Sequence, residues 1–248
     1  MSALTLFISD LHLDQNRPDS TRAFLNFLDS HASRAQSLYI LGDFFDTWIG
    51  DDYLRHEPKD AAIEEILTRL KQCTDNGLKL YFMHGNRDFL LGNEFMQRTG
   101  GKLLCDPTVI QLGSQPTLLM HGDSLCTQDT EYMNFRAESR SPEWIQDQLS
   151  KPISQRIAFA KHLRNVSMKK NSQTAENILD VDYQEVINVM EKHGVTQLIH
   201  GHTHRPKIHT ISIGTESKKR YVLGDWDNHA WYLSHQCETL QLLRFDYP

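Results

Sequence analysis

The 248-residue chain lacks most of the features that mark secreted, membrane-spanning or DNA-coating proteins. Its four cysteines are scattered and form no CxxC pair, so neither a disulfide framework nor a zinc knuckle is predicted. No apolar run approaches the roughly 18 residues that span a bilayer, and no basic region precedes the apolar N-terminal stretch. With 26 basic and 32 acidic side chains, bulk attraction to nucleic acid is excluded. We expect a cytoplasmic globular protein that binds no nucleic acid, with any membrane contact peripheral.

Short apolar runs alternate with helical patterns, which predicts an α/β fold. The runs that we interpret as buried strands, each followed by a polar cluster, cover residues 4–8, 38–41, 78–83, 117–120 and 197–199. Between the first three runs, apolar residues at i, i+3, i+4 and i+7 predict one helix through Phe24 and a second through Ile63. We therefore expect a mainly parallel sheet over the first part of the chain.

The second half of the chain has a different pattern. Candidate hairpins at 108–120, around Gly113, and at 207–224, around Gly214, predict a second and more antiparallel sheet. Residues 128–192 predict a helical insertion, ending in a helix before Gly194 whose apolar stripe is formed by Leu179, Tyr183, Val186 and Met190. We expect residues 1–248 to form one domain that carries this insertion.

Part of the insertion concentrates positive charge. Residues 148–175 contain no acidic side chain and six basic ones, namely Lys151, Arg156, Lys161, Arg164, Lys169 and Lys170. Apolar residues fall on one helical face of the same stretch: Ile153, Ile157, Ala160 and Leu163. Such a basic amphipathic helix can lie on an anionic membrane surface, or it can be a solvated face over a packed stripe. Four nearby aromatic residues either line an apolar groove or belong to the core: Tyr132, Phe135, Trp144 and Phe159.

The sequence is unusually rich in histidine, with 13 residues, and several of these histidines follow predicted strands. Asp10 and His12, two residues apart after the first strand, can reach one divalent ion from the same side. Metal-ligand types follow all five strands: Asp10, His12, Asp43, Asn86, His121, His202 and His204. Any one of these residues could simply belong to a turn, but ligands of open α/β sheets bind at the carboxyl ends of the strands, where all seven lie. Seven groups suit two ions about 4 Å apart, and without a thiolate they favour Mn, Fe or Zn.

The five blocks, in this order, resemble the signature of the calcineurin-like metallophosphoesterases, which is DxH, GD, GN(H/R)D, a lone His and GHxH. The resemblance runs from Phe7 to Trp226 and includes FISDLHL, YILGDFFDTWIGDD, HGNRDFLLG, MHGDSLCTQD, IHGHTHRP and VLGDW. These longer segments are similar to the branch of the family that acts on UDP-2,3-diacylglucosamine in bacterial lipid A synthesis. The resemblance implies a four-layer α/β/β/α sandwich in which the insertion forms a cap.

The resemblance also implies two manganese ions and a role for each ligand. Asp10, His12 and His204 would hold one ion. Asn86, His121 and His202 would hold the other, with Asp43 between them. Water would attack the α-phosphorus of the substrate and release UMP and 2,3-diacylglucosamine 1-phosphate, with Arg87, Asp43 and His121 as catalytic residues.

Further positions would bind the substrate. The implied substrate contacts are Asn86, Arg87, Asp129, Ser167, Asn171, Thr174 and His202. Arg87 replaces the histidine of many relatives, and its guanidinium suits a diphosphate oxygen and the charge of the transition state. Thr174 stands where some relatives have lysine. The basic cap would lie on the anionic inner leaflet of the bacterial inner membrane.

Two other interpretations remain open. The first is a metallophosphoesterase of another substrate class, such as a cyclic-nucleotide phosphodiesterase or a nuclease. A nuclease should carry basic and stacking aromatic residues along an open groove, whereas here the positive charge is confined to one insertion. The second is a scaffold without activity, which should have lost ligands, although all seven are present.

Overall fold

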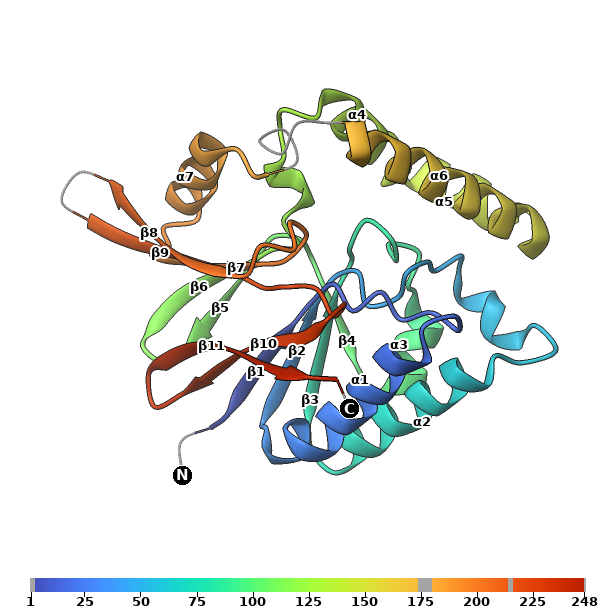
Figure 1. Ribbon diagram of the computed structural model, residues 1–248, viewed down its shortest axis with the longest axis horizontal. Helices are drawn as coiled ribbons and strands as arrows, with labels where there is room; N and C mark the ends of the chain where they lie inside the picture. The colour runs from blue at the N-terminus through green and yellow to red at the C-terminus, as the bar shows by residue number, and fades with distance from the viewer. Residues whose placement is uncertain (1–2, 174–179, 214–215, 248) are drawn as a thin grey trace.

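The structure is a computed structural model that describes residues 3–173, 180–213 and 216–247, and it contains two sheets packed face to face (Figure 1). The six-stranded sheet has the order β11-β10-β1-β2-β3-β4. Its strands are β1 (Thr5–Ile8), β2 (Ser37–Leu41), β3 (Lys79–Met83), β4 (Lys102–Leu104), β10 (His229–Gln236) and β11 (Thr239–Asp246). Strands β1 to β4 are parallel, and β10 and β11 add an antiparallel hairpin at one edge.

The five-stranded sheet has the order β5-β6-β7-β9-β8. Its strands are β5 (Thr108–Leu112), β6 (Gln115–Leu119), β7 (Gln197–His200), β8 (Lys207–Ile213) and β9 (Glu216–Val222). Hairpins β5–β6 and β8–β9 confirm both predicted hairpins, although Gly214 itself lies outside the described residues. Phe7 and Leu41 from the first sheet meet Leu119 and Ile199 from the second in a buried apolar layer.

Helices cover the outer face of each sheet, which confirms the four-layer α/β/β/α sandwich. The first sheet is covered by α1 (Pro18–Ser30), α2 (Ala61–Asp75) and α3 (Asn93–Thr99). Phe24 and Phe27 of α1 are fully buried in this layer. The second sheet is covered by α7 (Tyr183–Lys192), whose Val186 and Met190 share a buried cluster with sheet residues.

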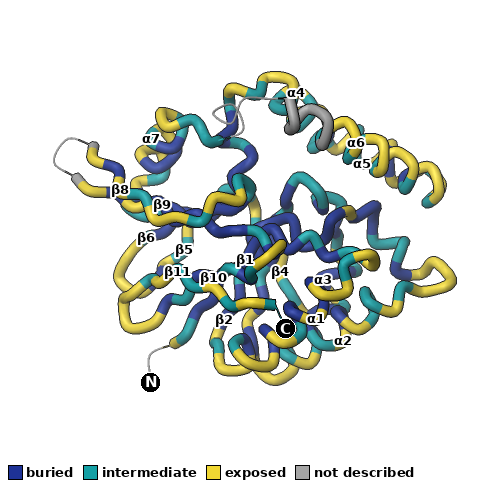
Figure 2. Tube along the Cα trace, viewed as in Figure 1, coloured by how far each residue is buried: buried dark blue, intermediate teal, exposed yellow. Residues whose placement is uncertain are grey.

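The predicted insertion divides into two parts with different surroundings. Helices α4 (Thr130–Ser139), α5 (Pro142–Ser150) and α6 (Ile153–Gln173) form the cap, on the side of the molecule where β1, β2 and β3 end (Figure 1). Figure 2 shows that α5 and α6 are exposed or intermediate along most of their described length. Helix α7 instead belongs to the sandwich, so the cap ends before it. The predicted stripe holds for Val186 and Met190, whereas Tyr183 is 59% exposed and Leu179 lies outside the described residues.

The C-terminal hairpin β10–β11 was not predicted. Its strands alternate polar and apolar residues, and the turn between them, Cys237–Glu238, has no glycine although both residues have positive φ. It therefore lacks the Asn-Gly or Asp-Gly signal that marks most two-residue turns. Within the described residues, no helix is both long and apolar enough to cross a bilayer.

Candidate metal centre

The loops after five strands meet at one edge of the sandwich because the strands run in register. Ile8 of β1 lies opposite Ile40 of β2, and Leu119 of β6 lies opposite Ile199 of β7. At this edge the backbone takes the left-handed conformation at five of the seven predicted ligands: Asp10 (φ 56°), His12 (φ 48°), Asp43 (φ 50°), His202 (φ 69°) and His204 (φ 55°). Asp, Asn and His tolerate this conformation better than most residues, and such strain concentrates at functional sites.

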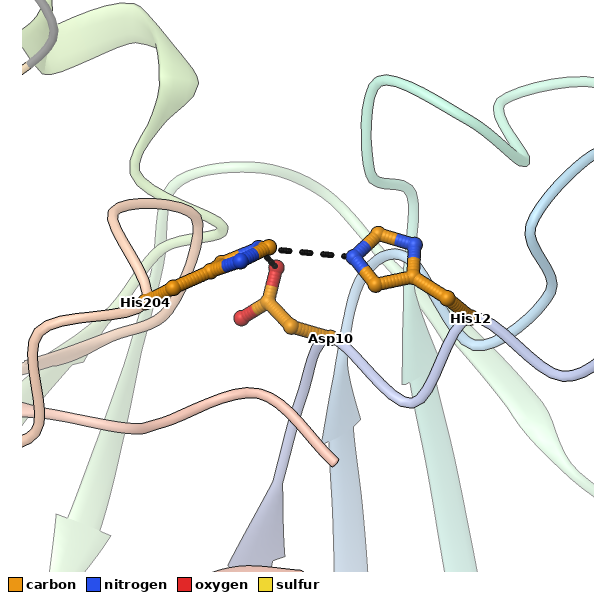
Figure 3. A group of neighbouring side chains, drawn as sticks. All are labelled: Asp10, His12 and His204. Atoms are coloured by element: carbon orange, nitrogen blue, oxygen red, sulfur yellow. Dashed lines mark hydrogen bonds and ion pairs between the residues drawn. The ribbon is translucent and has the colours of Figure 1, made fainter. Parts of the chain in front are cut away.

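Asp10, His12 and His204 form the first ligand group (Figure 3). The Nε2 atoms of the two histidines lie 3.3 Å apart, and His204 Nε2 lies 3.4 Å from Asp10 Oδ1. Asp10 is completely buried, and its Oδ2 accepts hydrogen bonds from Ser9 Oγ and, at 2.9 Å, from the backbone N–H of His202. The ion pair with His204 is the contact that this structure gives its Oδ1 among the described residues, so a cation between the two rings could take Oδ1 and both Nε2 atoms as ligands.

Asn86, His121 and His202 form the second group. Asn86 Oδ1 lies 3.0 Å from His121 Nε2 and 3.0 Å from His202 Nδ1. The Nδ1–H of His121 donates to the carbonyl of Leu41 at 2.9 Å, which leaves Nε2 available as a ligand. Three potential ligand atoms therefore converge on one point.

Asp43 lies between the two groups. Its Oδ2 is 4.0 Å from His12 Nε2, and its Oδ1 is 3.7 Å from His121 Nε2. The backbone N–H of Arg87 donates to Asp43 Oδ1 at 2.8 Å. Gly85 packs so closely that a Cβ there would collide with Asp43, which explains the glycine of the third block.

Two carboxylates that sequence reasoning did not assign support these ligands. Asp88, fully buried, accepts backbone N–H bonds from Phe44 at 2.8 Å and Gly85 at 2.8 Å, and so joins the second and third blocks. Asp225 Oδ2 lies 3.3 Å from His204 Nδ1, on the opposite side of the ring from Asp10. A carboxylate behind a metal-binding histidine orients the ring and raises its basicity. Both lie in the loop that follows a strand, within GNRD and VLGDW, which is the signal that could have identified them.

The charges of the site favour bound cations. Burial raises the pKa of Asp43 to about 7, and the neighbouring Asp88 and Asp10 carboxylates add to this rise. Burial acts against the charged form of His204, but hydrogen bonds and attraction to Asp10 and Asp225 raise its pKa to about 10. In the absence of metal, protons on Asp43 and His204 therefore neutralise part of the negative charge of the buried carboxylates. Carboxylate and imidazole donors that converge in this way fit Mn, Fe or Zn.

The site opens into a cavity of about 580 Å³, a usual size for a ligand pocket. His12, Asp43, Asn86, His202 and His204 are among its lining residues. Its apolar wall comprises Trp48, Ile49, Phe89, Leu90, Phe135, Trp144, Phe159, Ala160, Leu163 and Val166. The predicted aromatic residues of the insertion therefore line a groove.

The predicted substrate positions lie in different places. Arg87, Asp129 and Ser167 line the cavity, together with Asn86 and His202. Asp129 also caps α4 by accepting the backbone N–H of Tyr132 at 3.0 Å. The side chain of Asn171, and Thr174 as a whole, lie outside the described residues.

The family model of the calcineurin-like phosphoesterases matches residues 4–206, which include both ligand groups and the cap. The chain belongs to the calcineurin-like phosphoesterase family. Among solved structures, an archaeal phosphodiesterase matches this phosphoesterase with a TM-score of 0.50 over 98% of this chain and 99% of that chain, at 11% identity. At that identity the likeness supports the fold alone.

Curated relatives are much closer to this phosphoesterase in sequence. A UDP-2,3-diacylglucosamine hydrolase of Marinobacter nauticus is 50% identical over 92% of each chain. A protein of the same name from Pseudomonas aeruginosa is 51% identical over 92% of this chain and 93% of that chain. Another, from Cellvibrio japonicus, is 48% identical over 98% of this chain and 99% of that chain.

Part of the predicted basic surface of this phosphoesterase faces inward. Arg156 is 4% exposed and pairs with Asp52, to which its Nη1 donates at 2.8 Å, and it also donates to the carbonyl of Ile49. Arg164 pairs with the buried Asp46. The two arginines therefore attach α6 to the sandwich, and their charge is not free to meet a membrane. The side chains of Lys169 and Lys170 lie outside the described residues.

Proposed function

We propose that the chain hydrolyses the diphosphate of UDP-2,3-diacylglucosamine to UMP and 2,3-diacylglucosamine 1-phosphate. One observation carries this proposal: two ligand groups that share Asp43 open into a cavity whose wall, beneath the cap, is apolar. A substrate with a diphosphate and two acyl chains needs both parts. The names of the relatives at about 50% identity support the same reaction.

Two divalent ions, preferably Mn²⁺, would be held by the two ligand groups. Asp10, His12 and His204 would hold one, and Asn86, His121 and His202 the other, with Asp43 shared. Such ions activate water and neutralise phosphate charge during displacement at phosphorus. The convergence of Asp10 Oδ1 with the Nε2 atoms of His12 and His204, and of His121 and His202 on Asn86 Oδ1, supports these assignments.

Arg87 would bind the diphosphate. Its backbone is held on both sides, since its N–H donates to Asp43 and its carbonyl accepts the N–H of Trp48 at 3.1 Å. The half-buried side chain lines the cavity beside the ligand groups. Because guanidinium stays charged at neutral pH and donates in a planar fork, it suits two phosphate oxygens and the charge that develops as the α-phosphorus is attacked.

The cap would bind the acyl chains and face the anionic inner leaflet of the inner membrane from the cytoplasm. Its wall of the cavity is apolar, while Asp129 and Ser167 provide polar contacts. Phe159 and Val166 line the cavity and are also 37% and 49% exposed. We propose that these exposed side chains receive a lipid substrate from the membrane surface. Asn171 and Thr174 remain predicted contacts.

The test is product analysis in ¹⁸O-labelled water with purified protein, UDP-2,3-diacylglucosamine and Mn²⁺. We expect UMP that carries the label, since attack at the α-phosphorus leaves the new oxygen on UMP. Removal of metal with a chelator, His121→Ala or Asp43→Ala should stop the reaction, whereas His229→Ala, a surface change, should not. Label in the sugar phosphate would exclude attack at the α-phosphorus. Faster hydrolysis of a cyclic nucleotide or of single-stranded DNA would assign another substrate class.

A further inference from the structure

A group of charged and polar side chains around the buried Asp123, which we call the clasp, lies where the cap joins the metal centre. The clasp consists of Asp106, Asp123, Tyr132, Arg136 and Arg140. Tyr132 Oη donates to Asp123 Oδ2 at 2.5 Å, Arg136 Nε donates at 2.9 Å, and Arg140 Nη2 approaches the same oxygen at 3.5 Å. Arg136 also lies 3.6 Å from Asp106. The fully buried carboxylate of Asp123 thus contacts three side chains that are spaced four residues apart along α4 and its C-cap, Arg140.

Stability alone does not account for such a group. Buried ion pairs often contribute no more than apolar residues of the same volume, because desolvation offsets the attraction. Asp123 Oδ1 and both carboxylate oxygens of Asp106 have no hydrogen-bond partner in the described part of the chain, which adds to this cost. The contacts of the clasp with other residues are therefore the place to look for its role.

Each arm of the clasp ends beside one ligand of the second group. Arg140 Nη2 donates to the carbonyl of Gly85 at 2.8 Å, directly before Asn86. Asp123 lies two residues after His121. The ring of Tyr132 stacks on the ring of His202, with centroids 6.2 Å apart and an angle of 25°.

The first ligand group has no such support. Across residues 3–173, 180–213 and 216–247, no hydrogen bond, ion pair or ring contact joins the clasp to Asp10, His12 or His204. The clasp therefore touches one half of the centre only.

We propose that the clasp is a positioning device for the second metal ion, an inference that rests on the proposed two-ion function. By fixing the backbone before Asn86, the ring face of His202 and the chain two residues after His121, it holds three ligand atoms on one point before the metal arrives. Changes to groups behind metal ligands typically weaken metal binding about 10- to 100-fold. Loss of the clasp should weaken binding of the second ion by this factor and leave the affinity for the first ion unchanged.

The test is calorimetric titration of the full chain with Mn²⁺, with thermal unfolding as a check on the fold. We expect two bound ions in the unchanged protein. In Asp123→Asn and in Arg140→Met, one ion should bind as before and the second about 10- to 100-fold more weakly. Arg156→Met is the matched control, because it removes another ion-paired arginine of the cap, one that contacts Asp52 and Ile49 but no metal ligand.

The outcomes separate this inference from the proposed function. If both clasp variants bind two ions with unchanged affinity, the positioning role of the clasp is overturned and the proposed function is unaffected. A single ion in the unchanged protein would refute the two-ion centre, and the clasp with it. Loss of the second ion in Arg156→Met as well would show that any loosening of the cap has this effect, which also overturns the clasp. If Asp123→Asn does not fold, Arg140→Met decides, since its side chain is partly exposed.

Discussion

Gly85→Ala should move the shared carboxylate of the metal centre. A Cβ at this position would lie 2.8 Å from Asp43 Cγ and closer still to Asp43 Oδ1 and backbone N, whereas ordinary contact begins at 3.4 Å. The contact with Asp43 Oδ1, at 2.1 Å, must lengthen by about 1.3 Å to reach that distance, so Asp43 must shift by about 1 Å or more to admit the methyl group. Misplacement by about 1 Å at a reacting centre can cost about 100-fold in rate, so we expect a loss of about 10- to 100-fold in kcat/KM.

The assay for Gly85→Ala is hydrolysis of UDP-2,3-diacylglucosamine and of a small phosphodiester, bis(p-nitrophenyl) phosphate. Both rates should fall together, because Asp43 serves the chemistry and not the acyl chains. Gly101→Ala is the matched control: its Cβ would lie 2.8 Å from the ring of Phe82, away from the site. Both changes should cost about 1 to 3 kcal/mol of stability by overpacking. Wild-type rates in Gly85→Ala, or an equal loss of rate in Gly101→Ala, would refute the reasoning.

Three further outcomes follow from the same contacts. Arg87→Ala should lower kcat about 100- to 1000-fold while Mn²⁺ still binds in calorimetry, and an unchanged rate would remove its role. Ala160→Trp should fill the cavity and block the acylated substrate but spare bis(p-nitrophenyl) phosphate, whereas Ala158→Trp, on the exposed side of α6, should spare both. Burial and the Asp123 charge raise the pKa of Asp106 to about 6 from 3.8, so the folded chain holds this proton more tightly and loses stability as pH rises from about 4 to 6. Asp106→Asn should lose this slope and gain about 1 to 3 kcal/mol at pH 8, and identical unfolding curves would contradict the assignment.

The sandwich and its ligand edge could be predicted from sequence because both depend on short local patterns. A run such as residues 38–41, apolar and followed at once by Gly-Asp, identifies a buried strand and its carboxyl end together. Parallel register then brings these ends to one edge, whatever the details of packing. The ligand types at five such ends could therefore be assigned to one place before any contact was known.

What sequence reasoning missed depends on partners far along the chain. The positive charge of Arg156 gives no sign that it turns inward, since Asp52 lies more than 100 residues earlier. Likewise the apolar stripe of α7 predicts a buried face but not which surface covers it, and the second sheet proves to be that surface. Asp123 was recognised only as part of a motif, because its three partners come from a helix with no strong apolar pattern.

Charged pairs attach the cap at its edges, and the function that we propose for the cap accounts for them. Phe135, Trp144 and Leu163 of the cap line the cavity, and Trp144 also contacts Phe89 of the loop after β3, with ring centroids 5.8 Å apart. Under the proposed function the cap admits acyl chains, so this space is not filled by side chains and part of the attachment has to come from elsewhere. The pair of the buried Arg156 with the partly exposed Asp52 supplies it at one end, and the clasp supplies it at the other. Partly buried pairs of this kind are screened less by salt than fully exposed pairs are. The same contacts that leave the cavity open therefore also fix the cap on the metal centre.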